Sequence, residues 1–320
     1  MRYAGARLAQ AVPLLILISV AAFAIMHAAP GGPMTIYARN SPVSGSQIAR
    51  TRQSMGLDEP LPVQYIKWLG SLLRGDWGHS FASGRPVLPV ILERVPATLL
   101  LLATAFTIAL TLALVLGVVA ALTQHSKLDH LLSLFSFFSW AMPVFWSGLL
   151  AQQVFAVQLG LLPVAGMHAT GADDLVDLLH HLVLPALVLG LASIASWSRY
   201  LRSSLLEVLN QPYMVTARAK GNSRRRALTR HGLRNALIPL VTLLGLDVPL
   251  LITGAVVTET VFNWPGTGRL FLDSLVARDY PVEMGLLMIT ASLIVAGNLA
   301  ADLVYAALDP QVRLGARAIA

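Results

Sequence analysis

Two carboxylates of this 320-residue chain lie in or beside a long apolar stretch, where a charge is costly. Asp247 is near the middle of residues 236–258, and Glu259 directly follows them. An ionised aspartate at the centre of a membrane costs about 2.5–3.5 kcal/mol on insertion scales, so Asp247 is expected to face a polar partner or a wet cavity. Two roles stay open for Asp247: it lines a solute path and meets a cationic amino group, or it makes a structural hydrogen bond to a partner subunit. Glu259 either helps to gate such a path or caps a helix end.

The densest group of charges lies between residues 199 and 234, where nine cations occur. Gln211-Pro212 breaks one helix, and a short helix follows that Gly221 can end in the left-handed conformation open to glycine. Ser223 suits the start of a further helix. Contacts with anionic lipid, worth about 1 kcal/mol per cation, explain the charge but not this turn chemistry. We therefore predict that the segment docks in a groove of another protein, through Tyr213, Thr216, Ala217, Arg218, Ala219, Lys220, Gly221 and Arg224.

Catalytic and metal chemistry finds little support in the residue pattern. The chain has no cysteine, which excludes disulfides, thiolate metal sites and cysteine catalysis. It has no Gly-x-x-x-x-Gly-Lys-Ser/Thr run for phosphate, and neither Gly-x-Ser-x-Gly nor His-Glu-x-x-His, so an intramembrane enzyme lacks its expected groups. His180-His181 lies near Asp173, Asp174 and Asp177, but no ligand spacing is enforced there. We expect these side chains to solvate a short outer loop and predict no metal site.

The elements that position these residues are predicted to be membrane helices. Hydrophobic residues make up 56% of the chain and charged residues 12%, whereas a soluble domain has about a quarter of its residues charged. The mean hydropathy is +0.67. Six apolar runs approach the ~20 residues that cross a bilayer. We predict an all-α polytopic membrane protein whose six transmembrane helices lie near 9–29, 98–122, 132–157, 182–199, 236–258 and 284–307.

The orientation of these helices follows from the distribution of lysine and arginine. With the N-terminus inside, the inner segments carry fourteen cations, whereas the two short outer loops carry only Arg269 and Arg278. Both termini are therefore predicted to be cytoplasmic, and residues 30–97 to be outside. The first apolar run also resembles a secretory signal, but it is longer than a signal core and Pro30 follows its small residues. We predict a retained helix.

The outer stretch 30–97 contains one amphipathic element, over residues 61–73. Its apolar residues, among them Tyr65, Ile66 and Trp68, fall largely on one side of a helix. Two interpretations stay open. The element lies on the membrane or against a partner, or it covers the ends of the chain's own helices.

Several motifs closely resemble those of the permeases of binding-protein-dependent ABC transporters, in the dipeptide/oligopeptide/nickel branch. The coupling-loop signature is represented by Thr-Ala-Arg-Ala-Lys-Gly at 216–221 and Arg-His-Gly-Leu-Arg-Asn-Ala-Leu-Ile-Pro at 230–239. Further matches lie at 56–78, 142–146, 162–166, 258–268 and 309–310, so the resemblance covers nearly the whole chain. The general signature begins Glu-Ala-Ala, whereas this chain has Thr216-Ala217-Arg218-Ala219 in that place, a variant typical of the peptide branch.

The resemblance implies the fold of a type-I ABC importer permease in the bacterial plasma membrane. Residues 1–97 would form the first helix and an extracytoplasmic subdomain, 98–309 a five-helix core with a coupling loop at 200–235, and 310–320 a cytoplasmic tail. It implies no cofactor and no enzyme activity in this chain. ATP and Mg would bind two separate ATP-binding subunits, and a second permease subunit and an extracytoplasmic substrate-binding protein would complete the assembly, with no nucleic acid.

The substrate that the resemblance implies is a di- or oligopeptide, with a nickel chelate or glutathione as the alternatives within the family. A stand-alone secondary transporter is the rival outside it. That class predicts inverted repeats and transport without ATP, and the sequence contains no visible repeat.

Overall fold

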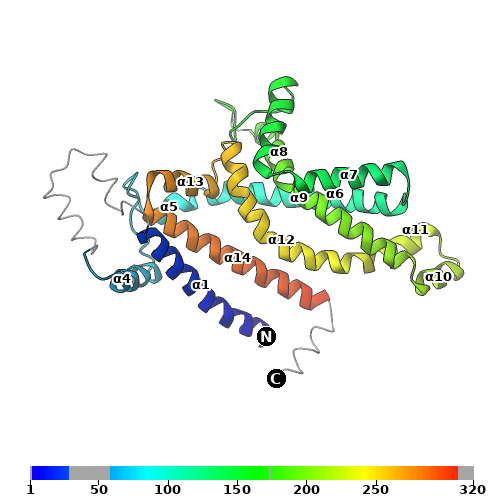
Figure 1. The fold of residues 1–320 in the computed structure, drawn as a ribbon, viewed down its shortest axis with the longest axis horizontal. Helices are drawn as coiled ribbons and strands as arrows, with labels where there is room; N and C mark the ends of the chain where they lie inside the picture. Colours follow the sequence, from blue (N-terminus) through cyan, green and yellow to red (C-terminus); the bar gives the residue numbers. More distant parts are fainter. Residues whose placement is uncertain (1, 29–57, 173, 309–320) are drawn as a thin grey trace. The chain divides into compact units, whose positions relative to one another are not determined.

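The computed structural model describes residues 2–28, 58–172 and 174–308, and all structural statements below concern these residues. Within them the regular structure is helical, and the one β-bridge joins His79 to Pro86. The all-α prediction is thus confirmed. The chain divides into two compact units, residues 1–98 with 265–295 and residues 99–264 with 296–320. The elements along the chain are drawn in Figure 1.

Four of the described helices are long and apolar enough to cross a membrane. These spans are Gln10–Ala28, Val87–Leu122, Leu175–Leu209 and Tyr280–Leu299, and a bent pair, Lys127–Ala141 with Val144–Gln158, adds a fifth if it counts as one span. The predicted fifth span, 236–258, falls within α12 (Arg234–Val261), whose shorter apolar part is Leu251–Val261. The described residues therefore establish a multi-pass membrane protein, and the number six stays a prediction.

The stretch 132–157, predicted as one span, is divided at Met142 and Pro143. Helix α7 (Lys127–Ala141) ends there, and α8 (Val144–Ala151) continues directly into the π-helix η1 (Gln152–Gln158). The segment Val144–Gln158 is bent by 111° from α7. Met142 is extended, with ψ at 129°. Proline disfavours helical geometry in the residue before it and cannot donate a backbone hydrogen bond, which explains the corner.

The first unit contains α1 (Arg2–Ala28), α4 (Leu61–Leu73), α5 (Val87–Leu92), α13 (Thr267–Ala277) and the beginning of α14 (Tyr280–Leu308). Phe23 and Met26 of α1 form a buried cluster with Met284, against which Tyr65 and Trp68 of α4 pack. Helix α4 has the predicted bounds. One of its faces therefore covers the chain's own helices, as the second interpretation of residues 61–73 requires.

A buried carboxylate closes the loop after α4 onto the turn after α13. Arg278 ends α13 with φ at 51°, and Asp279 beside it is buried. The Asp279 carboxylate accepts hydrogen bonds from the Ser80 hydroxyl and from the backbone N–H groups of Phe81 and Ala82, the last two at 2.9 and 3.2 Å. This arrangement holds two segments together that are some 200 residues apart in sequence.

The second unit is built around α9 (Leu175–Leu209), which α7, α8 and α12 contact. Helix α6 (Val95–Leu122) approaches α9 closely at two glycines. A Cβ at Gly117 would lie 2.8 Å from the Ser198 carbonyl oxygen, and one at Gly190 would lie 3.1 Å from that of Ala105. Small residues are typical of such contacts in membranes, because they allow the helix backbones to approach.

Candidate functional site

The segment from Leu209 to Arg234 has the helices and turns that its sequence predicts. After α9 ends, Pro212 opens α10 (Pro212–Ala219), which Lys220 and Gly221 terminate. Gly221 has φ at +83°, the left-handed region. Ser223 caps α11 (Arg224–Ala227), since its hydroxyl oxygen accepts from the Arg226 N–H at 3.3 Å. The π-helix η2 (Leu228–Leu233) then leads into α12. We call residues 212–227 the coupling segment.

The coupling segment has one face packed against the chain and one face exposed. Met214 and Ala217 of α10 are buried, and Gly232 of η2 lies beside the Met214 methyl group. Val215 is 66% exposed. Of the sequence-predicted docking residues only Ala217 points inward, and the exposed ones are Tyr213, Thr216, Arg218, Ala219, Lys220, Gly221 and Arg224.

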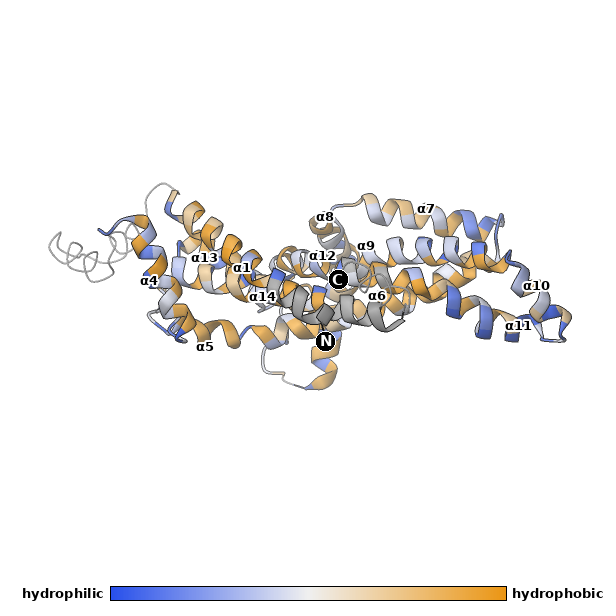
Figure 2. Ribbon diagram, turned by 90° about the horizontal axis from the view of Figure 1, so that it is seen from below, coloured by the Kyte–Doolittle hydropathy of each residue, from blue (hydrophilic) through white to orange (hydrophobic). Residues whose placement is uncertain are grey.

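The exposed face of the coupling segment is strongly basic. Arg218, Lys220 and the three arginines of α11 make no ion pair within the described part of the chain. Figure 2 shows the concentration of hydrophilic residues at α10 and α11. The Tyr213 hydroxyl accepts a hydrogen bond from the Asn235 side-chain amide at 3.2 Å. An apolar residue and several cations thus face outward from a small, well-capped element.

Asp247 has a partner in its own chain. The indole N–H of Trp197 in α9 donates to Asp247 Oδ2 at 2.6 Å, and the ring of Phe106 meets the buried Trp197 edge-on. Sequence reasoning missed Trp197. A signal was present, because a buried indole N–H needs an acceptor and an aspartate within an apolar stretch is a suitable one.

Glu259 is fully buried near the end of α12, and its backbone carbonyl accepts from the Trp264 N–H at 2.8 Å. Here two motifs of the sequence meet. The Gly166 N–H donates to the Phe262 carbonyl at 2.8 Å, and the Gln152 side-chain amide donates to the carbonyls of Val164 and Val261. Residues 162–166 and the part of the second motif at 259–264 therefore form one packed corner.

Comparison with known proteins decides the family. The family described as "Binding-protein-dependent transport system inner membrane component" matches residues 113–314. The family that represents the N-terminal region of such components matches residues 1–102. This chain belongs to that family. The chain is 44% identical over 308 residues to the oligopeptide transport system permease protein AppB of Bacillus subtilis, covering 96% of this chain and 97% of that protein.

Other family members are similarly related over their whole length. The dipeptide transport system permease protein DppB of Escherichia coli is 36% identical, with 96% and 97% of the two chains covered. The glutathione transport system permease protein GsiC of Salmonella paratyphi A is 38% identical, with 98% and 99% covered. A solved chain of the inward-facing MetNI methionine ABC transporter shares the fold, with a TM-score of 0.57 at 16% identity over 69% of this chain and 97% of that one.

The histidines near Asp177 in this family member serve local structure. His168 Nδ1 lies 3.1 Å from Asp177 Oδ2, and His181 Nδ1 lies 2.9 Å from the Asp177 carbonyl oxygen. His180 Nε2 lies 2.9 Å from the Leu161 carbonyl oxygen. No group of three or more histidines and carboxylates with metal-binding geometry occurs among the residues that the structure describes. Asp173 lies outside them.

Proposed function

We propose that this chain is one permease subunit of an ATP-driven importer that carries di- or oligopeptides across the inner membrane. The observation that carries the proposal is an exposed, capped, basic turn on an apolar chain of this family. The peptide substrate is supported by relatives named for oligopeptides and dipeptides. Glutathione, the substrate in the name of a third relative, is itself a small peptide and is the alternative within the proposal.

The coupling segment is proposed to dock in a cleft of an ATP-binding subunit. Its exposed residues would supply the contact: Tyr213 and Val215 an apolar part, Arg218, Lys220 and Arg224 a charged part. Gly221 would allow the chain to turn back at the point of closest approach. Charge complementarity at such a surface speeds association and fixes orientation more than it adds affinity. Two ATP-binding subunits that close on Mg-ATP would then move the permease through this contact.

Asp247 is proposed to line the path and to attract the amino end of a peptide. It is half-buried, so that part of the side chain stays accessible beside the Trp197 contact. Glu259, by contrast, is buried in the corner formed with residues 162–166 and is proposed to hold the end of α12. A second permease subunit would complete the path, and an extracytoplasmic binding protein would deliver the peptide.

The experiment that tests the proposal is reconstitution in proteoliposomes. The chain would be co-expressed and purified with a second permease, ATP-binding subunits and a binding protein from the same organism, and uptake of labelled di-, tri- and pentapeptides would be measured. We expect uptake that requires ATP and every component. Uptake by the isolated chain, driven by an ion gradient, would instead support a secondary transporter and overturn the proposal.

A further inference from the structure

The first turn of α7 is joined to α9 by a two-pronged ion pair. Asp129 is almost fully buried, with 5% of its side chain exposed. The Arg202 guanidinium donates from Nε to Asp129 Oδ1 and from a terminal nitrogen to Asp129 Oδ2, both at 2.7 Å. Such paired hydrogen bonds fix the relative orientation of the two groups as well as their distance.

Asp129 is itself held in place by the turn that begins α7. The His125 N–H donates to Asp129 Oδ2 at 3.0 Å, and the Ser126 hydroxyl oxygen accepts from the Asp129 N–H at 3.2 Å. Ser126 is the cap of α7, so both the backbone and the side chain of Asp129 are held by the turn that precedes the helix. A pull on Asp129 is therefore transmitted to the whole N-terminal end of α7 rather than to one flexible side chain.

Arg202 lies on the same continuous helix that leads to the coupling segment. Helix α9 runs without a break from Leu175 to Leu209, and α10 begins three residues later at Pro212. At 1.5 Å per residue, Arg202 is about 10 Å from the end of α9 at Leu209. Ser204, half a turn beyond Arg202, also donates its hydroxyl to the Ala236 carbonyl of α12 at 3.0 Å. The C-terminal part of α9 is thus bonded to both α7 and α12.

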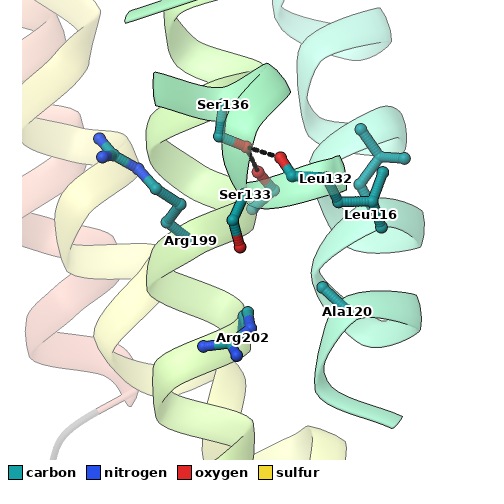
Figure 3. Close-up of a pocket in the computed structure, with 8 residues that line it drawn as sticks. Leu116, Ala120, Leu132, Ser133, Ser136, Arg199 and Arg202 are labelled. Carbon is teal, nitrogen blue, oxygen red and sulfur yellow. Dashed lines mark hydrogen bonds between the residues drawn. The ribbon is translucent and has the colours of Figure 1, made fainter. Parts of the chain in front are cut away.

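Beside the ion pair, a small hollow lies between α6, α7 and α9. Figure 3 shows a hollow there, with Arg199 and Arg202 on one side and Leu116 and Ala120 on the other. Ser133 and Ser136 of α7 also line it, and the Ser136 hydroxyl lies 3.5 Å from that of Ser198. At this hollow the two helices are joined by small hydroxyl side chains, which fix their relative orientation less than the two-pronged ion pair does.

The neighbouring arginine does not provide a similar tie. Arg199, one turn before Arg202, places its guanidinium over the rings of Phe137 and Trp140, at 5.0 and 5.7 Å from their centroids, and its Nε donates to Ala195 of its own helix. In the described part of the chain Arg199 pairs with no carboxylate. A contact with a ring face allows movement that a two-pronged ion pair does not.

We propose that Arg202 and Asp129 are a positioning pair that makes α7 follow α9 when the coupling segment moves. This inference rests on the proposed function, in which that movement is driven by ATP. Without the pair, α9 would still move with the ATP-binding subunits, but α7 would lag. ATP would then be hydrolysed with less transport.

A substrate-independent measurement tests the pair directly. Because the natural chain has no cysteine, spin labels can be attached to Leu134→Cys on α7 and Glu207→Cys on α9, both at exposed positions outside the proposed docking contact. In the assembled complex we expect the distance between the labels to stay the same in the nucleotide-free and ATP-trapped states. With Asp129→Asn or Arg202→Gln added, we expect the distance to differ between the two states. An unchanged distance in both variants would overturn the inference.

Transport provides the second readout. For Asp129→Asn, Arg202→Gln and the milder Arg202→Lys, we expect ATP hydrolysis within about twofold of the natural complex and at least a fivefold fall in peptide moved per ATP. Arg199→Gln, one turn away, is the matched control and should change neither quantity.

Cross-linking tests whether a link between the two helices is sufficient. An Asp129→Cys/Arg202→Cys protein should regain coupling when a short bifunctional thiol reagent bridges the two cysteines. Full coupling in all three variants, or no recovery on bridging, would contradict the pair's role, whereas failure of the natural complex to use ATP would contradict the proposed function instead.

Discussion

The indole N–H of Trp197 and the carboxylate of Asp247 lie 2.6 Å apart, which joins α9 to α12 at the one acidic residue of the 236–258 stretch. This hydrogen bond offsets part of the cost of a polar group in an apolar setting. It occupies one of the two carboxylate oxygens, Oδ2. Trp197 thus fixes the position of the Asp247 carboxylate. The proposed role of Asp247 in the path depends on the charge of that carboxylate.

Replacement of Asp247 by Asn separates the charge from the hydrogen bond. The amide oxygen can still accept from Trp197, so we expect the complex to assemble normally. Uptake of peptides with a free amino end should fall by about fivefold to tenfold, equivalent to about 1–1.4 kcal/mol, whereas N-acetylated peptides should be little affected. Uptake is measured in proteoliposomes at subsaturating peptide. Equal uptake of both peptide kinds before and after the change would refute the role in the path.

Trp197→Phe is the complementary variant, because it removes the donor and keeps the charge. We expect a loss of stability of about 1–3 kcal/mol from the unpaired carboxylate oxygen and the lost indole volume. The selectivity for a free amino end should remain. Thermal unfolding of the detergent-purified complex measures the first effect, and the uptake assay measures the second.

Gly221→Ala tests the turn of the coupling segment. Gly221 has φ at +83° with open space around its Cα, so alanine meets no neighbour and the cost is conformational, about 1–2 kcal/mol. We expect a reduced share of ATP-binding subunits in the purified complex, by about fivefold. Gly171 has φ at +84° and equally open surroundings in another turn of the same unit, so Gly171→Ala is the matched control. Equal losses in the two variants would mean that Gly221 has no special part in docking.

How much of the molecule the sequence predicts depends on the range of the interactions involved. The break at Pro212, the cap at Ser223 and the glycine at 221 are local, and the structure contains all three. The bounds of α4 follow from its own periodicity in the same way.

Long-range partners were beyond the sequence pattern. The Trp197–Asp247 bond joins residues 50 apart and the Arg202–Asp129 pair residues 73 apart, and each depends on how the helices pack. The bend at Met142-Pro143 was missed for another reason, since the apolar composition continues through the corner and conceals it. Residues 29–57 and 309–320, including the predicted cytoplasmic tail, lie outside the described residues.

Asp279→Ala tests the closure of the first unit. The carboxylate accepts from the buried Ser80 hydroxyl and from two partly buried backbone N–H groups, and its removal leaves all three without this acceptor. We expect a destabilisation of about 2–4 kcal/mol, seen as a lower midpoint of thermal unfolding. Asp273 is exposed, and its ion pair with Arg269 is long, at 3.7 Å. Asp273→Ala should therefore change the free energy of unfolding by less than about 0.5 kcal/mol. A neutral effect of Asp279→Ala would show that water replaces the carboxylate.

The exposed face of α4 is the last region with a testable role. Ile66 and Leu73 are 68% and 80% exposed, whereas Tyr65 and Trp68 of the same helix pack on Phe23. Deletion of residues 62–73 would therefore disrupt the unit's own core, and only substitutions on the exposed face separate a docking role from a structural one.

Ile66→Ser with Leu73→Ser should leave folding unchanged, because these side chains are already largely in contact with solvent or lipid. If the face receives the binding protein, stimulation of ATP hydrolysis by the loaded binding protein should fall by about tenfold, while basal hydrolysis stays the same. Tyr65→Ala with Trp68→Ala is the contrasting variant and should lower the unfolding midpoint by loss of buried aromatic area. Normal stimulation in the serine variant, together with weaker binding of that variant's α4 peptide to phospholipid vesicles, would assign this face to the membrane surface instead.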